Sequence, residues 1–265
     1  MIQGHFIASA QHKLFITQYG QNNSQKNVLL LPSLFEEMNL CRAILAKQAF
    51  YLNQHGYCVY ALDYAGTGDS EGEVEEFTVQ HWQQNVLDAV SWLSAQGVSS
   101  IDLWGVRFGA LLAMQSVQSI QELLPINSIL LWKPVAKGKQ FMTQFLRLKQ
   151  ANSMMQGQEK VNWRQHILDG NETEVAGYPI NSALLRSIDE LEMPKQLEFD
   201  VPICWMELAA AKLTPAIAMQ TKLWPDDQYQ LASYEGSAFW QIPEIFVQPD
   251  LLEPTLNALE VSHGA

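Results

Sequence analysis

Two glycines flank an arginine in the segment Gly105-Val106-Arg107-Phe108-Gly109, and this spacing carries the clearest chemical signal in the chain. The apolar run 101–104 before it predicts a strand, and the stretch 108–119 after it predicts a helix. Glycine at both flanks lets a strand and a helix approach closely around a sharp turn whose central residue has a strained backbone. A guanidinium at that centre is permanently protonated, so it cannot attack a carbonyl group.

The same strand–turn–helix arrangement carries the nucleophilic serine of α/β-hydrolases, in the motif G-x-S-x-G. Two earlier segments agree with that fold. Residues 32–39 lie where the fold places its oxyanion loop, and residues 63–72 match the turn D-x-x-G-x-G-x-S-x-G that is common in these enzymes. The segment Gly66-Thr67-Gly68 lacks the third glycine of a dinucleotide-binding loop. We therefore predict an α/β-hydrolase fold in which Arg107 replaces the nucleophilic serine.

An acid and a base should follow the last two strands of such a fold. Glu207 is the carboxylate at the first of these positions, and we interpret it either as a shifted catalytic acid or as the partner of a buried cation. No histidine occupies the second position, and His263 lies beyond the predicted terminal helix. Without a base nearby, Ser33, Ser70 and Ser237 are ordinary weak alcohols.

Arg107 is expected at the apex of the turn with a positive φ angle, facing the crevice at the carboxyl ends of the strands. A buried guanidinium needs a partner, which Glu36, Glu37 or Glu207 could supply as an ion pair. Alternatively, Arg107 binds the carboxylate or phosphate of a ligand, and the two roles can coexist. Aromatic walls would suit a sugar or lipid-linked sugar, although aromatic residues more often form plain core. The predicted ligand-binding residues are Arg107, Phe108, Phe35, Glu36, Glu37, Glu207 and Trp240, with Trp132 as a further wall.

Short apolar runs alternate with longer amphipathic segments along the chain, which indicates βαβ units and a mostly parallel sheet of about eight strands with helices on both faces. The alternation breaks at about residues 138–198, which we predict to be a helical cap inserted into a single α/β-hydrolase domain spanning residues 1–265. The predicted strands are 6–8, 14–19, 28–31, 58–63, 101–104, 129–132, 202–206 and 229–234. The predicted helices are 36–55, 77–96, 108–119, 215–223 and 251–261.

Composition narrows the classes of partner. The chain has 265 residues, of which 48% are hydrophobic, so a large core is expected. Its net charge of −12 opposes nucleic acid and anionic membrane surfaces, while leaving room for a local cationic pocket. No apolar run approaches the roughly 20 residues that cross a bilayer, and the N-terminus has no signal-peptide pattern. We predict a cytoplasmic protein without a membrane span, and its oligomeric state is left open.

The three cysteines, Cys41, Cys58 and Cys204, are scattered and show no metal-ligand spacing. We interpret them as buried thiols in a reducing compartment. Cys41, near the start of a long predicted helix, has no histidine placed to activate it. The histidines likewise show no paired spacing, so we predict neither a metal nor a cofactor.

Several segments carry a resemblance to one known family. They are Pro32 with Glu36-Glu37-Met38-Asn39, residues 103–113, Leu131-Trp132-Lys133-Pro134-Val135 with Gly138-Lys139-Gln140-Phe141, Gln144-Phe145-Leu146-Arg147-Leu148, and Phe239-Trp240-Gln241 with Glu244-Ile245. Through these segments the chain resembles the type 2 hydrolase associated with the exosortase A system of bacteria that use PEP-CTERM protein sorting. The resemblance covers nearly the whole chain, and this family also carries arginine at the turn. It implies a setting of exopolysaccharide production and envelope sorting, but no established reaction.

Two classes of function stay open at this point. One is a diverged hydrolase or acyl-transfer-like enzyme that acts on an ester or glycolipid-like substrate by a route without serine. The other is a scaffold without catalysis that binds a small anionic, sugar-like or lipid-like ligand, or a partner, in the crevice at Arg107. We do not expect serine-hydrolase activity from either.

Overall fold

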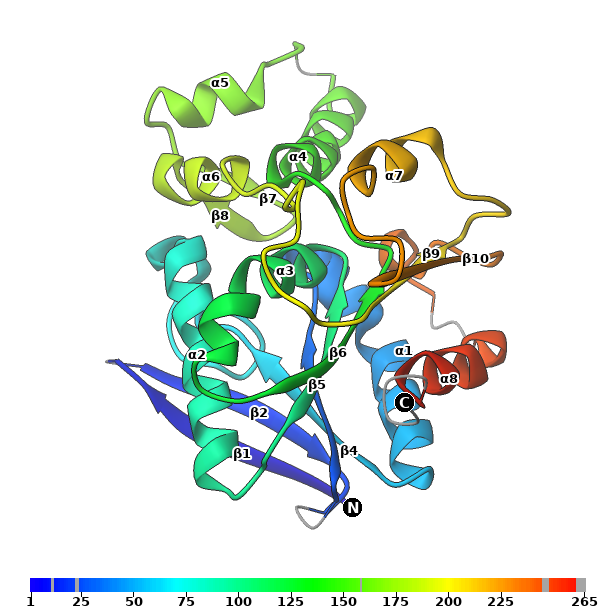
Figure 1. Cartoon of the computed structure of the whole chain (residues 1–265). Helices are drawn as coiled ribbons and strands as arrows, with labels where there is room; N and C mark the ends of the chain where they lie inside the picture. The colour runs from blue at the N-terminus through cyan, green and yellow to red at the C-terminus, as the bar shows by residue number, and fades with distance from the viewer. Residues whose placement is uncertain (11, 22–23, 158, 245–247, 261–265) are drawn as a thin grey trace.

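The structure is a computed structural model that describes residues 1–10, 12–21, 24–157, 159–244 and 248–260. Its centre is an eight-stranded sheet in the order β1-β2-β4-β3-β5-β6-β9-β10 (Figure 1). β1 pairs with β2 and β2 with β4 in antiparallel fashion, and the remaining pairs are parallel. The predicted mostly parallel sheet is therefore confirmed. The strands are β1 Ile2–Ser9, β2 His12–Tyr19, β3 Lys26–Leu31, β4 Tyr57–Asp63, β5 Ile101–Val106, β6 Ile126–Trp132, β9 Ile203–Leu208 and β10 Tyr229–Tyr234.

Helices cover both faces of this sheet (Figure 1). α2 (Val79–Ala95) and α3 (Phe108–Gln121) bury their apolar sides in one core cluster. α1 (Phe35–Gln54) and α8 (Leu252–Glu260) bury theirs in a second cluster on the opposite face. The central strands β3, β5 and β6 are buried on both faces, which explains their nearly continuous apolar sequences.

Residues 138–198 contribute no strand to the eight-stranded sheet in their described part, which omits residue 158. They lie above the carboxyl ends of the strands in Figure 1. Two strands that the sequence pattern did not indicate form a separate hairpin in this segment. Its elements are α4 (Gly138–Met155), α5 (Trp163–Leu168), β7 (Thr173–Val175), β8 (Tyr178–Ile180) and α6 (Ser182–Asp189).

Element ends differ from the predicted ones by a few residues. β1 begins at Ile2 instead of residue 6, because pairing with β2 continues along the whole strand and does not need an apolar side chain at each position. α7 (Pro215–Gln220) is shorter than expected. The predicted end of the terminal helix, Val261, lies outside the described residues, and so does His263. Three short 3-10 turns, η1 (Val74–Glu76), η2 (Phe239–Gln241) and η3 (Pro249–Leu251), complete the architecture.

Candidate functional site

Arg107 sits between β5 and α3, at the carboxyl edge of the sheet, with φ of 55°. This confirms the predicted positive φ. The two flanking glycines explain how the turn closes. A side chain at Gly105 would collide with the backbone of Ala110, and one at Gly109 would collide with the carbonyl groups of Leu31 and Pro32. Helix α3 therefore begins in direct backbone contact with the end of β3, and only glycine fits there.

The Arg107 guanidinium forms a two-point ion pair with Glu37 in the first turn of α1. Its Nε lies 3.1 Å from Glu37 Oε2 and its Nη2 lies 3.0 Å from Oε1. The predicted contact with one of the nearby glutamates is thus confirmed, and Glu37 is the partner. Ser33 Oγ donates a further hydrogen bond to the same carboxylate, at 2.7 Å. The Arg107 side chain is 5% exposed and that of Glu37 is 15% exposed, so solvent screens this pair little.

Two further guanidinium hydrogens also have acceptors. Nη1 donates to the carbonyl oxygen of Lys133 at 3.2 Å, and Nη2 donates to Gln144 Oε1 at 3.2 Å. The guanidinium carbon lies 5.0 Å from the ring centre of Trp240, within cation–π range. Because an arginine has five N–H donors, this arrangement leaves one for any further partner. The charge of Arg107 is thus largely satisfied inside the protein.

Glu207 forms a second ion pair beside the first one. It binds Lys133 Nζ, and Trp205 Nε1 donates to its other oxygen at 3.2 Å. Lys133 follows β6, which lies between β5 and β9 in the sheet, so its side chain reaches the residue at the end of β9. Glu207 is therefore the partner of a cation, as one interpretation proposed, but that cation is Lys133 and not Arg107. Sequence reasoning missed both Lys133 and Gln144.

A cavity of about 390 Å³ opens next to these ion pairs. Its walls come from the start of α1, one side of α4, and η2 with the residues just after it. Most lining side chains are apolar, and carboxylate and amide groups form a minority. Glu37, Gln144 and Trp240 belong both to the lining and to the contacts of Arg107. The lining residues are Glu36, Glu37, Leu40, Phe141, Gln144, Phe145, Leu148, Trp240, Gln241 and Pro243.

Three aromatic residues expected at the cavity lie behind it or elsewhere. Phe35 has φ of 55° and stacks at 4.5 Å on Phe145, which is the residue that reaches the cavity. Phe108 is fully buried against Trp82 and Phe141. Trp132 does not wall this cavity, because its strand turns it into the core on the α1 face, against Trp104. Sequence spacing alone could not show on which face of the sheet each ring lies.

Among the described residues, no base is placed to activate a serine at this site. Ser70 Oγ donates to the carbonyl of Asp63 at 2.6 Å, and Ser33 is bound to Glu37. Burial raises the pKa of the Cys41 thiol well above its usual range, and the nearby charge of Glu37 adds to this effect, while Arg107 opposes it. None of the five histidines in the described ranges contacts Arg107, Glu37 or Glu207; these are His5, His12, His55, His81 and His166.

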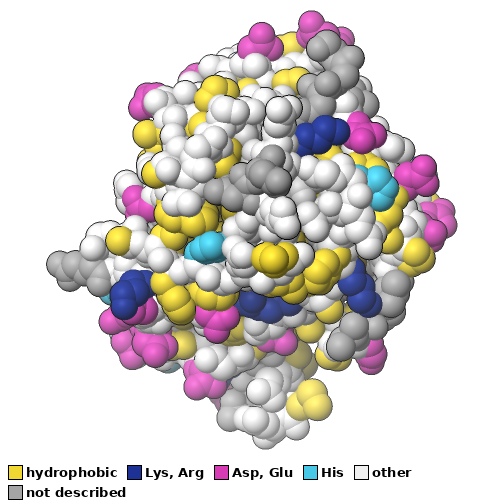
Figure 2. Space-filling model, turned by 90° about the horizontal axis from the view of Figure 1, so that it is seen from below, with side chains coloured by type: hydrophobic (Ala, Val, Ile, Leu, Met, Phe, Trp, Pro, Cys, Tyr) yellow, Lys and Arg dark blue, Asp and Glu magenta, His cyan; other side chains and the backbone are white. Residues whose placement is uncertain are grey.

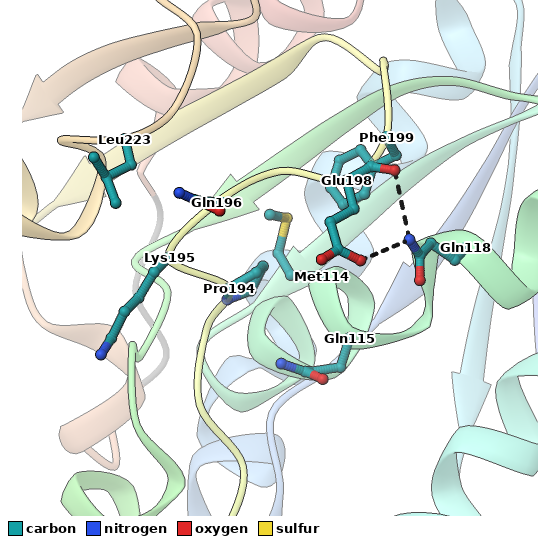
Figure 3. A pocket seen from close by; sticks show the side chains of 9 residues that line it. All are labelled: Met114, Gln115, Gln118, Pro194, Lys195, Gln196, Glu198, Phe199 and Leu223. Carbon is teal, nitrogen blue, oxygen red and sulfur yellow. Dashed lines mark hydrogen bonds between the residues drawn. The ribbon is translucent and has the colours of Figure 1, made fainter.

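A second cavity, of about 510 Å³, lies between α3 and the loop that leads into β9 (Figure 3). Amide or charged side chains make up five of its nine lining residues, and Gln118 Nε2 donates to Glu198 Oε2 at 3.2 Å (Figure 3). None of its lining residues forms a hydrogen bond, ion pair or cation–π contact with Arg107, so we place the candidate site at the smaller cavity. Over the described residues there is no cluster of His, Cys, Asp and Glu that could hold a metal ion. No described helix is both long enough and apolar enough to cross a membrane.

Two comparisons with known sequences match part of the chain. Residues 10–131 match the model of a family described as acyl transferase. A carboxylesterase of Bacillus subtilis (strain 168) is 31% identical over 65 residues. That match covers 24% of this chain and 26% of the carboxylesterase, so it spans about a quarter of the relative's length.

Solved structures match over almost the whole chain at low identity. Est1E from Butyrivibrio proteoclasticus, with ferulic acid bound, has a TM-score of 0.70 at 18% identity, and the match covers 97% of this chain and 96% of Est1E. The esterase EaEST from Exiguobacterium antarcticum has a TM-score of 0.64 at 16% identity, with 99% and 100% covered. The thioesterase domain from the curacin biosynthetic pathway has a TM-score of 0.59 at 15% identity, with 98% and 99% covered. The chain therefore has the α/β-hydrolase fold, with a buried arginine–glutamate pair where that fold usually presents its serine.

Proposed function

We propose that this chain is a hydrolase- or acyl-transfer-like protein that holds the apolar part of an ester or glycolipid-like substrate in the cavity beside Arg107. The observation that carries the proposal is the cavity itself. Its volume of about 390 Å³ falls in the range of small-molecule sites, and its walls are mainly apolar with a few polar groups among them. The acyl transferase family model and the esterase-like fold support an acyl group as the ligand.

The chemistry of such a site would avoid an acyl-enzyme on serine. Arg107 has no nucleophilic atom, and Glu37 is held by three hydrogen-bond donors from Arg107 and Ser33. The groups with access to the cavity are Glu36, Gln144 and Gln241. They can orient a hydroxyl or carbonyl group by hydrogen bonds, so a reaction here would rely on positioning a substrate and an acceptor.

A second candidate, binding without catalysis, is favoured by a different observation. The position that a hydrolase keeps open for its nucleophile is filled by a guanidinium with four of its five N–H groups already used. In this alternative, the fold serves as a scaffold that holds the same ligand or a partner protein. For either candidate, the family resemblance supports a role in exosortase-linked protein sorting and exopolysaccharide production.

One experiment tests the cavity and separates the two candidates. Octanoyl esters and thioesters are offered to the protein with and without a sugar acceptor, binding is measured by calorimetry, and product is measured by mass spectrometry. We expect Leu40→Asp, which puts a charge in the cavity wall, to weaken binding at least tenfold. The matched control Leu123→Asp changes an exposed leucine in the turn just after α3, outside the cavity lining, and should leave binding unchanged.

The outcomes are distinct. Product release that is lost in Leu40→Asp identifies an enzyme, and binding without product identifies a scaffold. If no octanoyl compound binds, or if both variants bind equally well, the cavity is not an acyl site. Deletion of the gene in its host, followed by measurement of secreted polysaccharide, tests the proposed setting independently.

A further inference from the structure

Positive charge is concentrated in one part of this acidic chain. Residues 137–164 contain six of its 16 lysines and arginines but only one of its 28 carboxylate residues, Glu159. Two of the six cations are neutralised, Lys137 by Glu192 and Arg164 by Asp189. The other four have no ion-pair partner among the residues that the structure describes: Lys139, Arg147, Lys149 and Lys160.

The same segment exposes large apolar side chains on α4. Leu148 is 46% exposed, Met154 is 64% exposed and Met155 is 87% exposed. The helix buries Phe141, Met142, Phe145 and Leu146 on its inner side. At 3.6 residues per turn, Arg147 and Met154 lie in one row on the outer side, and Leu148 and Met155 lie in the adjacent row. Cationic and apolar side chains therefore share one outward surface, which we call the α4 face (residues 147, 148, 154 and 155).

A hollow of about 520 Å³ adjoins the α4 face, between α4 and the segment that leads into α5. Arg147 and Lys160 line it, together with Trp163. Lys149 Nζ lies 5.3 Å from the centre of the Trp163 ring. Arg164 also lines it, but its charge is used by Asp189 and it donates to the Lys139 carbonyl at 3.0 Å. The hollow thus offers two unpaired cations and an aromatic ring to an anion.

The position of this surface in the molecule is suited to docking. α4 and α5 form one end of the molecule in Figure 1, beyond the carboxyl ends of the strands. Figure 2 shows the molecule from below, at the end away from α4 and α5, and there the lysines and arginines are dispersed among acidic and apolar side chains. Leu148 belongs both to the α4 face and to the lining of the candidate site, so the cavity opens beside this surface.

We propose that the α4 face and its hollow dock on an anionic phospholipid surface. Exposed leucine and methionine side chains gain free energy on entering the boundary between headgroups and acyl chains, and nearby lysines and arginines are attracted to anionic headgroups. An acidic protein would satisfy the cations but would place carboxylates against the two methionines. The proposal does not rest on the proposed function, although docking would bring the cavity next to lipid.

Vesicle binding tests the proposal directly. The full chain is sedimented with vesicles of phosphatidylglycerol and phosphatidylcholine, and separately with phosphatidylcholine alone, in 0.1 M salt, where screening acts over about 10 Å and the local cations outweigh the distant acidic surface. We expect binding to the anionic vesicles only. Replacing Arg147 and Lys160 together by glutamine should weaken it about 30-fold, from roughly 1 kcal/mol for each cation near the surface.

Matched variants control for charge and apolar surface elsewhere. Lys212→Gln with Lys222→Gln removes two exposed cations near α7, and Met219→Ser removes a methionine that is 78% exposed there. These variants should bind within twofold of the unaltered chain, whereas Met155→Ser should bind several-fold more weakly. Absence of binding to anionic vesicles, binding to both vesicle types alike, or equal losses in the α4 and α7 variants would overturn the proposal. The proposal would also be overturned if the chain bound an acidic protein but did not bind vesicles.

Discussion

Arg107 and Glu37 form their ion pair at the point where an α/β-hydrolase exposes its nucleophile. The pair is buried and joined by two hydrogen bonds, and its members also contact Ser33, Gln144 and the ring of Trp240. Such an arrangement fixes the start of α1 against the turn before α3. Arg107 therefore stabilises the fold, and its loss would affect folding before it affected any reaction.

Removing one partner of this pair should be costly. Arg107→Ala leaves the Glu37 carboxylate buried and unpaired, so we expect the free energy of unfolding to fall by about 3 kcal/mol or more. The matched control is Lys13→Ala, which removes a surface ion pair with Glu71 and should cost less than about 1 kcal/mol. Urea denaturation measures both. Similar losses in the two variants would show that the buried pair contributes nothing special.

Restoring serine should not restore serine chemistry. Arg107→Ser would present a hydroxyl group with no described histidine beside it, so we expect neither the unaltered chain nor this variant to turn over p-nitrophenyl esters. Fluorophosphonate probes should label neither, while a serine esterase in the same assay is labelled. Stoichiometric labelling that disappears when one serine is changed would contradict this prediction.

At the scale of elements, the turn between β5 and α3 depends on contact between backbones. Gly109→Ala would push a methyl group into the carbonyl groups of Leu31 and Pro32, neither of which can move without shifting the end of β3. We expect a loss of about 3 kcal/mol, at the upper end of the typical cost of overpacking a buried site.

A second glycine provides the control for this prediction. Gly97 has φ of +86° and open space around it, so Gly97→Ala should cost only the roughly 1 to 2 kcal/mol of a left-handed backbone. Thermal unfolding of the two variants gives the comparison. A Gly109→Ala variant as stable as Gly97→Ala would show that strand and helix separate more readily than the packing indicates.

α4 connects the two sites that we propose. Its inner side supplies Phe141, Gln144 and Phe145 to the cavity, and its outer side forms the α4 face. We propose that residues 138–198 act as a cap that covers the candidate site, since they lie over the carboxyl ends of the strands. In that case, docking on lipid and access to the cavity would be controlled by the same helix.

At the scale of the whole molecule, burial of the thiols makes stability depend on pH. Burial raises the pKa of Cys204 to about 11 and raises that of Cys58 and Cys41 as well. Unfolded thiols ionise near pH 8.5. Below that value both states keep their protons. Above it only the unfolded state ionises, so the stability due to the protonated thiols is present at pH 7 and falls as the pH rises.

We therefore expect the urea midpoint to decrease between pH 8 and pH 9.5, before tyrosines ionise. Cys204→Ala should reduce this slope without altering its sign. A thiol reagent at pH 8 should react slowly with the folded chain and fully in urea. Rapid reaction of a folded thiol, or a midpoint that rises with pH, would show that at least one cysteine is more accessible than the structure indicates.

Much of the fold followed from local sequence patterns. The order of apolar runs and the two glycines at the turn predicted the parallel sheet, the positive φ of Arg107 and a glutamate as its partner. The positive φ depends only on the turn between β5 and α3, whereas the partner glutamate lies 70 positions earlier and was predicted from the order of elements in the fold. The order of the strands also places Lys133, after β6, between Arg107, after β5, and Glu207 on β9, so the contact of Lys133 with Glu207 could have been predicted.

Tertiary structure decided the rest. Only packing determined that Glu37 and not Glu36 pairs with Arg107, that Trp132 turns into the core, and that Trp240 covers both cations. Gln144 reaches Arg107 from α4, 37 positions further along the chain. The sequence by itself determined which residues stand at strand ends and turns. Which of them meet depended on how helices and the 138–198 segment settle over the sheet, because contacts between distant segments follow from the shape of the whole core and not from local spacing.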